Sequence, residues 1–347
     1  MTLKVALLGY GYAGKTIHAP FIRATSGLDL VAVGSRDAAK VHADLPDAAV
    51  AAPDLVLAQP DVDLVVIATP NHTHHELARR ALAVGKHVIV DKPFATTADE
   101  ARDLVRRAEA ASRVLSVFHN LRWNGDTLTV RRLIEDGRLG EVVHFESHYD
   151  RYRPTVRPRW REQAGPGSGI WYDLGAHLVD QALQLFGPPR AVSADLAMQR
   201  VGAEAVDYFH VVLRYDRRRV ILHGSNLVAG GSARFVIHGD MASYVKYGVD
   251  PQEAALQRGE RPGSPGWGRD PRAGMLYLPD GFDTIEQPVP TMPGDWGLYY
   301  AGVRDAIVGG GPNPVPPADA VAVMEILERA TLSSAQRCEL PVLSPPE

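Results

Sequence analysis

The chain has 347 residues, of which 45% are hydrophobic, enough to bury the cores of two domains. Its formal net charge of −4 argues against a large basic surface for nucleic acid or anionic membranes. The single cysteine, Cys338, excludes an intramolecular disulfide framework and a thiolate metal cage. Neither a signal-peptide pattern nor an apolar run of about 20 residues is present, so we expect a cytoplasmic protein.

The first fourteen residues contain the most informative motif. Residues 4–8 form a buried-strand pattern that leads directly into Gly-Tyr-Gly-Tyr-Ala-Gly. In this G-x-G-x-x-G spacing, Gly9 allows a tight turn, Gly11 lets the backbone approach a pyrophosphate, and Gly14 lets the next helix lie close to the strand. A helical segment (15–25) and a second apolar strand (28–33) follow. We therefore predict a βαβ unit that binds dinucleotide phosphates at the helix N-terminus.

The first third of the chain continues this alternation of strand and helix. Further strands are predicted at 64–68, 87–90 and 114–118, with helices at 75–83 and 98–111 between them. Each strand is short and continuously apolar, as strands buried on both faces are. Residues 1–120 are thus predicted to be a doubly wound NAD(P)-binding Rossmann domain.

After residue 120 the pattern changes. Two helices (126–135 and 172–185) accompany strands with alternating polarity, predicted at 142–147, 205–215, 220–225 and 234–238. Such strands indicate a large, mostly antiparallel sheet covered by helices on one face, so residues 121–347 are predicted to be an α/β substrate-binding and oligomerisation domain. Its open face would join copies of the chain into a homo-oligomer.

The C-terminal part of this domain is less regular. Residues 250–295 are rich in proline and glycine, which indicates either an ordered loop over the active site or a mobile insertion. Helical patterns return at 298–307 and 318–334, and these helices could pack back on the first domain.

The end of the second strand bears on the choice of cofactor. Ser35 stands roughly where an NAD-binding fold places an acid, and Arg36 follows it. A guanidinium next to a hydroxyl suits the 2′-phosphate of NADP, so NADP is predicted. Asp37 keeps NAD as an alternative.

Histidines gather after the strand at 64–68, in the segment 69–76. His72, His74 and His75 could hold a metal, but no carboxylate or thiolate at helical spacing completes such a site. A polar helix N-terminus beside the cofactor, capped by Asn71 or Thr73, accounts better for the segment. We therefore predict cofactor contacts and no metal. The contacts are assigned to Thr69, Pro70, Asn71 and His74.

Two further motifs carry groups suited to proton transfer. Lys92 and Pro93 end the strand at 87–90, where a lysine ammonium beside a cationic nicotinamide would have a lowered pKa and could hydrogen-bond a reacting hydroxyl; a plain surface lysine is the alternative. Asp173 and His177 are four positions apart on a predicted helix and so share a face. They fit a general base with its orienting acid, but also half a metal site or a purely structural contact.

Together, the glycine motif, Asp91-Lys92-Pro93 and Asp173 with His177 resemble the glucose-fructose oxidoreductase/inositol dehydrogenase (Gfo/Idh/MocA) family over nearly the whole chain. Ser35-Arg36 and the segments 69–74 and 120–123 resemble its NADP-dependent scyllo-inositol dehydrogenase-like branch. Asp91 departs from the glutamate usual in the family.

The resemblance implies that the large sheet of the second domain joins chains into a homodimer or homotetramer. It also implies that Lys92, Asp173 and His177 form a catalytic triad. The triad would move a hydride between the nicotinamide and a secondary alcohol of a cyclic polyol or sugar, without a metal. Alternatives are a cofactor-binding regulator with the same fold, or a reductase of another sugar-derived, imine or enone substrate. Further contacts are expected for the cofactor at Tyr10, Tyr12, Ala13, Pro93, Asn120, Arg122, Trp160 and Arg161, and for the substrate at Tyr152, Arg153, Asp173 and His177.

Overall fold

The computed structural model describes residues 1–342, and its contacts divide the chain into two compact units. The first unit consists of Met1–Trp123, Gln252–Trp267 and Asp295–Val321; the other described residues form the second. The first unit therefore includes two segments from the range 121–347. The second of them contains the helix predicted at 298–307, one of the two that could pack back on the first domain, whereas the sequence of 252–267 did not indicate its place.

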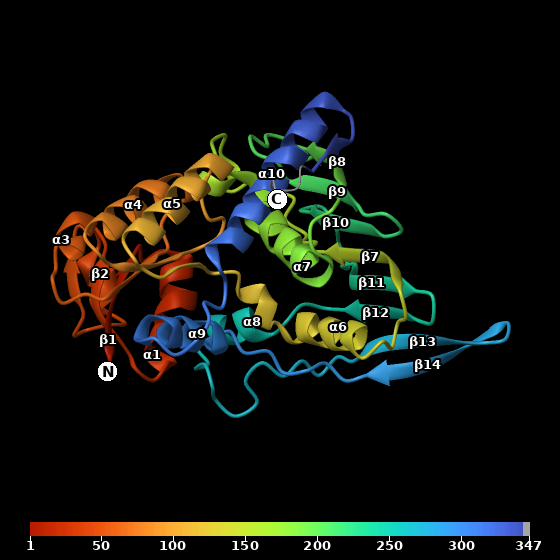
Figure 1. The fold of residues 1–347 in the computed structure, drawn as a ribbon, viewed down its shortest axis with the longest axis horizontal. Coiled ribbons are helices and arrows are strands. Elements are labelled where there is room, and N and C mark those ends of the chain that lie inside the picture. Colours follow the sequence, from red (N-terminus) through yellow and green to blue (C-terminus); the bar gives the residue numbers. More distant parts are fainter. Residues whose placement is uncertain (343–347) are drawn as a thin grey trace. The chain divides into compact units, whose positions relative to one another are not determined.

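The first unit, whose strands β1 and β2 are labelled in Figure 1, is built on a six-stranded parallel sheet. Its strand order is β3-β2-β1-β4-β5-β6. Every residue of β4, and all but one each of β1 and β5, is at least 91% shielded from solvent, because helices cover both faces. The sequence missed β3, which has only three residues and is half-exposed. The strands are β1 (Leu3–Leu8), β2 (Leu28–Gly34), β3 (Ala49–Ala51), β4 (Leu64–Ile67), β5 (His87–Val90) and β6 (Leu115–Val117).

The helix after the glycine motif is not a single α-helix as predicted. It begins as a π-helical turn, η1 (Ala13–His18), and continues as α1 (Ala19–Ala24). Pro20 lacks the N–H that would bond to the carbonyl of Thr16 in a regular α-helix, and the Ala19 N–H bonds five residues back to Gly14. The other helical elements of this unit are α2 (Ala38–His42), α3 (Pro53–Leu57), η2 (Asn71–Thr73), α4 (His74–Ala83), α5 (Ala98–Ala110), η3 (Asn120–Trp123), α8 (Gln252–Gln257) and α9 (Gly297–Val308).

The second unit contains a nine-stranded sheet with the order β14-β13-β12-β11-β7-β10-β9-β8-β15. Among its described pairs, β7 and β10 run parallel and the others antiparallel, as predicted for a mostly antiparallel sheet. The strands are β7 (Val142–His148), β8 (Ala191–Ala197), β9 (Tyr208–Arg214), β10 (Arg219–Ser225), β11 (Ala233–Gly239), β12 (Ser243–Tyr247), β13 (Gly274–Asp280), β14 (Asp283–Val289) and β15 (Leu340–Pro341).

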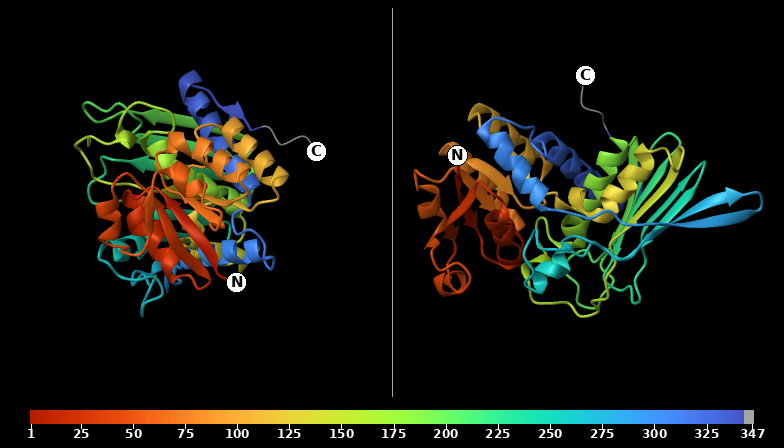
Figure 2. Two further views of the ribbon diagram at one scale, coloured as in Figure 1. Left: turned by 90° about the vertical axis from the view of Figure 1, so that its left-hand side faces the viewer. Right: turned by 90° about the horizontal axis from the view of Figure 1, so that it is seen from below.

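The two faces of this sheet differ in their cover. Helices α6 (Gly125–Glu135) and α7 (Ala176–Phe186) lie on one side of the strands (Figure 2). Phe145 of β7 points to that side, where its ring contacts Phe186. His144, Glu146 and His148 alternate with it and face the other side, where they are half-exposed. The long helix α10 (Pro317–Gln336) contributes its first residues to the first unit and the rest to the second.

Residues 250–295 contain more regular structure than their composition indicated. Helix α8 belongs to the first unit, and β13 and β14 form a hairpin at the edge of the second unit's sheet (Figure 1). All but the last residue of β14 are exposed, so the strand lacks the alternation of polarity from which a strand is predicted. Within residues 1–342, the helices are too short or too polar to span a bilayer.

Candidate functional site

The glycine motif forms a cradle at the carboxyl end of β1. Gly9 has φ of 96°, and a Cβ on it would lie 2.5 Å from the carbonyl oxygen of Ala68. A Cβ on Gly14 would lie 2.1 Å from the carbonyl oxygen of Gly9, so only glycine lets strand, turn and helix approach this closely. Gly11 is exposed, and a Cβ there would meet no atom within 4 Å. The backbone is thus tightly packed at Gly9 and Gly14, whereas space remains beside Gly11. A dinucleotide pyrophosphate needs such a space next to the backbone.

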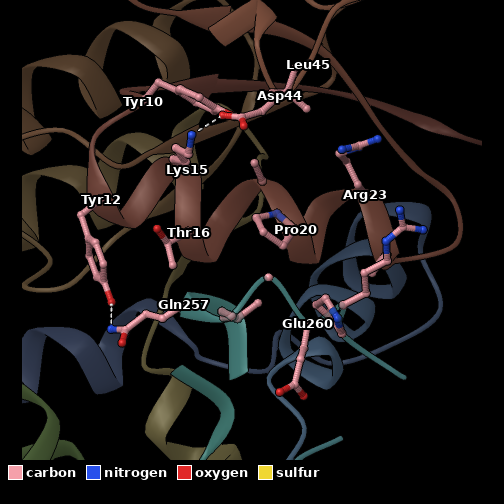
Figure 3. A pocket seen from close by; sticks show the side chains of 16 residues that line it. Tyr10, Tyr12, Lys15, Thr16, Pro20, Arg23, Asp44, Leu45, Gln257 and Glu260 are labelled. Carbon is pink, nitrogen blue, oxygen red and sulfur yellow. Dashed lines mark hydrogen bonds and ion pairs between the residues drawn. The ribbon is translucent and has the colours of Figure 1, made fainter. Parts of the chain in front are cut away.

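The two tyrosines of the motif point away from this open position. Tyr10 is buried, and its hydroxyl donates to Asp44 at 3.2 Å; burial and the nearby carboxylate raise the pKa of Tyr10 to about 12. The Tyr12 hydroxyl donates to Glu253 at 2.6 Å and accepts a hydrogen bond from Gln257, both in α8. Both tyrosines line a pocket of about 850 Å³ beside η1 and α1 (Figure 3). Their side chains therefore anchor the glycine loop to its surroundings.

The residues after β2 have separate tasks. The Asp37 carboxylate accepts a hydrogen bond from the backbone N–H of Lys40 at 2.9 Å and so caps α2, and the Ser35 hydroxyl accepts one from the N–H of Asp37 at 3.1 Å. Arg36 is exposed. The acid that kept NAD as an alternative is therefore engaged by a helix terminus.

The prediction that a side chain of Asn71 or Thr73 caps α4 is wrong. Thr73 occupies the N-cap position, but its hydroxyl donates to the carbonyl of Pro70 at 2.7 Å and accepts from Thr69, so the helix has no side-chain cap. Asn71 is buried at the start of η2. This preceding helical turn leads the chain directly into α4 and takes the place of a capping side chain.

His74 joins two loops of the sheet edge. Its ring is fully buried, with Nδ1 2.9 Å from the carbonyl oxygen of Pro93 and Nε2 2.9 Å from that of Thr69. His75 instead contacts Asp103, and His72 is exposed, so the three neighbouring histidines have different surroundings. His74 thus connects the loop after β4 to the loop after β5, and its contact with a cofactor stays a prediction.

Lys92 follows β5, and the residue before it is held by partners that the sequence did not indicate. Asp91 is buried, and its Oδ1 accepts a hydrogen bond from the Lys92 backbone N–H at 2.8 Å. Its Oδ2 lies 3.7 Å from Nε2 of His18, whose Nδ1 is 2.5 Å from the hydroxyl of Tyr300 in α9. Burial would raise the pKa of Asp91, but His18 and the charges of Lys92 and His74 outweigh it and hold that pKa well below its usual range.

His18 and Tyr300 carry no motif, because they are 282 positions apart and meet only in the folded core. The Lys92–Pro93 peptide bond is cis.

Asp173 and His177 lie in the second unit, at a junction of two helix types. Asp173 belongs to a π-helical turn, η5 (Trp171–Gly175), and His177 to the α-helix α7. The regular helix predicted over 172–185 is therefore wrong at its start, where α-helical spacing does not describe how the side chains face. Gly175 is required here, because a Cβ would lie 2.2 Å from the ring of Trp171.

Two residues expected to contact the cofactor lie beside this turn. The Nε atom of Arg161 is 3.6 Å from a carboxylate oxygen of Asp173, and its guanidinium lies over the ring of Trp160 at 4.6 Å. The structure thus brings Arg161 and Trp160 together with one member of the predicted triad.

The loop that carries these residues is anchored by Arg200, which the sequence analysis missed. Its buried guanidinium donates to the carbonyl oxygens of Arg153 and Thr155 at 3.1 and 3.3 Å, and pairs with Glu162 at 3.0 Å and Asp207 at 2.8 Å. The two expected substrate contacts in this loop differ, since Tyr152 is 61% exposed and Arg153 is half-buried. Only the fold could reveal Arg200, because its partners come from two separate parts of the chain, the loop of residues 153–162 and Asp207.

Asn120 and Arg122 lie in η3 and are both buried. The guanidinium of Arg122 is 3.0 Å from a carboxylate oxygen of Asp319 in the first turn of α10. Arg122 thus ties η3 to a late segment of the first unit. A cofactor contact by either residue stays a prediction, as does the joint action of Lys92 with Asp173 and His177.

A parallel sheet of this strand order with an open glycine turn at β1 defines a Rossmann-type nucleotide-binding fold. Residues 3–119 match the family model described as the NAD-binding Rossmann fold of an oxidoreductase family, and residues 131–342 match its C-terminal alpha/beta domain. The chain belongs to the Gfo/Idh/MocA family of oxidoreductases.

Relatives resemble the whole chain. It is 52% identical to the oxidoreductase YdgJ of Escherichia coli over 97% of this chain and 98% of the relative. It is 38% identical to the scyllo-inositol 2-dehydrogenase (NADP⁺) IolW of Bacillus subtilis, over 97% and 95%. A solved structure of the YPO2259 putative oxidoreductase from Yersinia pestis superposes with a TM-score of 0.95 at 51% identity, covering 99% of this chain and 98% of that one.

Proposed function

We propose that this oxidoreductase uses NADP to transfer a hydride between the nicotinamide and a secondary alcohol or ketone of a cyclic polyol or sugar. The observation that carries the proposal is the carboxyl edge of the parallel sheet. There the open glycine turn follows β1, and Lys92, with its ionised neighbour Asp91, follows β5. Ligands of open α/β sheets bind at this edge. The similarity to a relative named as an NADP⁺-dependent inositol dehydrogenase supports the substrate class and the cofactor.

The residues of the first unit fit the cofactor. Gly9, Gly11 and Gly14 would hold the pyrophosphate, and Ser35 with the exposed Arg36 would hold the 2′-phosphate. Asp37 is engaged as the cap of α2, which favours NADP over NAD. When bound, the nicotinamide supplies the hydride acceptor or donor.

The proposed acid–base groups have distinct tasks. In the oxidative direction, His177 takes the proton of the substrate hydroxyl, and Asp173 orients its ring. The ammonium of Lys92 donates a hydrogen bond to the reacting oxygen and stabilises the negative charge that develops there. In reduction, the same groups return the proton. The ion pair with Arg161 holds the Asp173 carboxylate in place.

A panel of cyclic polyols and sugars, followed by absorbance of the reduced nicotinamide with NADP⁺ and with NAD⁺, tests the function. We expect turnover with at least one cyclic polyol, higher with NADP⁺. His177→Ala should lower turnover by about 10² or more, whereas His238→Ala, an exposed histidine of β11, should leave it unchanged.

Tight cofactor binding without turnover on any alcohol, ketone, imine or enone would favour the regulator and overturn the proposal. Turnover confined to imines or enones would retain the enzyme and replace the substrate class.

We further propose that copies of the chain associate through the open face of the nine-stranded sheet. Val212, Ile221 and Val236 lie on this face, half-buried and without a helix above them. Light scattering should give a mass of two or four chains, and Ile221→Lys should shift it towards one chain. An unchanged mass would place the interface elsewhere.

A further inference from the structure

Histidines form a row across the open face of the nine-stranded sheet. In the register of the strands, His148 of β7 is paired with His223 of β10, and His223 with His210 of β9. The rings of His148 and His223 are 5.2 Å apart, and those of His223 and His210 are 5.8 Å apart. None of these residues belongs to the proposed cofactor or substrate sites. The row therefore needs an explanation of its own.

Asp150 completes a compact group with two of these histidines. One carboxylate oxygen lies 3.6 Å from Nδ1 of His148 and the other 3.5 Å from Nε2 of His223. One ligand atom from each residue can be chosen so that all three lie within 4.8 Å of one another. Tetrahedral zinc with bonds of about 2.0–2.1 Å separates its ligand atoms by about 3.3–3.4 Å. Small side-chain rotations would thus bring the three atoms onto one ion.

The Nδ1 atom of His148 is the sharpest indication of a missing partner. It is buried and makes no hydrogen bond within residues 1–342, because the nearest carboxylate oxygen is beyond hydrogen-bond distance. Buried polar atoms in folded proteins are almost always satisfied. A cation placed between His148, Asp150 and His223 would satisfy this atom.

Neighbouring residues hold His148 and Asp150 in place through hydrogen bonds, as residues around a metal site do for its ligands. The Nε2 atom of His148 lies 2.8 Å from a carboxylate oxygen of Glu146, the contact that orients a metal-bound histidine and raises its basicity. Asp150 accepts hydrogen bonds from the Ser225 N–H at 2.9 Å and from the Ser232 hydroxyl. The side chain of Asp150 is only 3% exposed, and those of His148 and His223 are 18% and 17% exposed. The site is therefore fixed in shape and open on one side.

We propose that His148, Asp150 and His223 bind one divalent transition-metal ion, for which Zn²⁺ is the best match to two imidazoles and a carboxylate. A water molecule or a residue of a second copy of the chain fills the fourth position. The ion joins β7 to β10, the parallel pair at the middle of the sheet, so its effect is on stability. The sequence led to the expectation that the chain binds no metal. His148 and Asp150 are two positions apart, but His223 comes from another strand, so the sequence did not indicate that the three residues meet.

Zinc binding to the purified full-length protein tests the proposal after treatment with EDTA. Calorimetric titration with ZnCl₂ should give one ion per chain, or one per two chains if copies share it, with a Kd of about 1 µM or below. The ion should raise the Tm. Cobalt(II) should give the intense visible absorption of a four-coordinate site.

Variants separate this site from loose binding at surface histidines. His148→Gln and His223→Gln should each weaken zinc binding about 100-fold or more, and Glu146→Gln about 10-fold, as the loss of an orienting partner does. The control His238→Gln changes an exposed histidine on the neighbouring strand β11 and should leave the Kd unchanged. Should a histidine variant fail to fold by circular dichroism, Asp150→Asn removes the charge at nearly constant volume and gives the same test.

Weak binding of several ions per chain, or equal losses in His223→Gln and His238→Gln, would show adventitious binding and overturn the proposal. Hydride-transfer activity is not part of this test, so the site can fail while the proposed function holds.

Discussion

Two alanine substitutions in the glycine motif separate its two physical roles. Gly11→Ala adds a methyl group where no atom lies within 4 Å, and Gly11 has no left-handed φ that alanine would resist. Gly14→Ala places its methyl 2.1 Å from the backbone oxygen of Gly9. The first variant should therefore fold normally and bind the cofactor poorly, whereas the second should lose stability first.

The magnitudes follow from these contacts. A methyl forced against backbone costs about 1–3 kcal/mol of folding free energy, which lowers the Tm of a unit of this size by about 2–12 °C. Gly11→Ala should leave the Tm unchanged or slightly raised, because alanine restricts the unfolded chain more than glycine does. Its methyl group would occupy the space of the pyrophosphate and should weaken NADPH binding at least about tenfold. This corresponds to a loss of about 1.4 kcal/mol in binding free energy.

Thermal unfolding without cofactor and titration of NADPH fluorescence measure both effects on the same samples. If Gly11→Ala binds NADPH as tightly as the unmodified protein, the pyrophosphate does not lie at Gly11. If Gly14→Ala has the same Tm as the unmodified protein, the backbone at Gly9 can move to accept the methyl group. The close contact between Gly14 and Gly9 then does not require glycine.

Further predictions concern charged groups. Arg36→Ala should weaken NADPH binding about tenfold and leave NADH binding unchanged, and an equal loss for both cofactors would refute the contact with the 2′-phosphate. Because the pKa of Asp91 is lowered in the folded protein, its contribution to stability is complete above about pH 4 and is lost as the pH falls. Asp91→Asn should therefore flatten the fall of Tm below about pH 4. His18→Ala brings the folded-state pKa of Asp91 closer to its unfolded value and should make the same fall smaller; curves parallel to that of the unmodified protein would contradict this. Arg200→Met leaves the buried carboxylate of Asp207 without its ion-pair partner, whereas Glu162 keeps Arg159. The variant should cost about 3–5 kcal/mol in urea unfolding, against about 0–1 kcal/mol for Arg217→Met, which breaks an exposed pair.

The fold could be predicted where the sequence pattern is local. Residues 4–8, 64–68 and 87–90 are continuous apolar runs, and the structure has strands there to within one residue at each end. Patterns failed where tertiary contacts decide the structure. The hairpin of β13 and β14 pairs by backbone hydrogen bonds at a sheet edge, with almost no burial on β14 to impose an alternation of polarity.

The candidate site divides in the same way. Gly9, Gly11 and Gly14 could be assigned because each role depends on backbone geometry within a few residues. His18 and Arg200 could not be assigned, because their partners are distant in the chain and buried polar residues of either type are usually structural.

The neighbourhood of Lys92 shows how these distant contacts would support chemistry. The Asp91 side chain is short and buried, and a buried carboxylate stays ionised only if other groups stabilise its charge. His18 supplies that stabilisation from the helix that follows the glycine motif, and Tyr300 fixes the imidazole from the opposite side. The segment that would bind the pyrophosphate and the segment that carries Lys92 are therefore joined through one buried histidine. The Asp91 carboxylate in turn accepts the hydrogen bond of the Lys92 N–H, so the imidazole is linked to the backbone of Lys92 through one carboxylate.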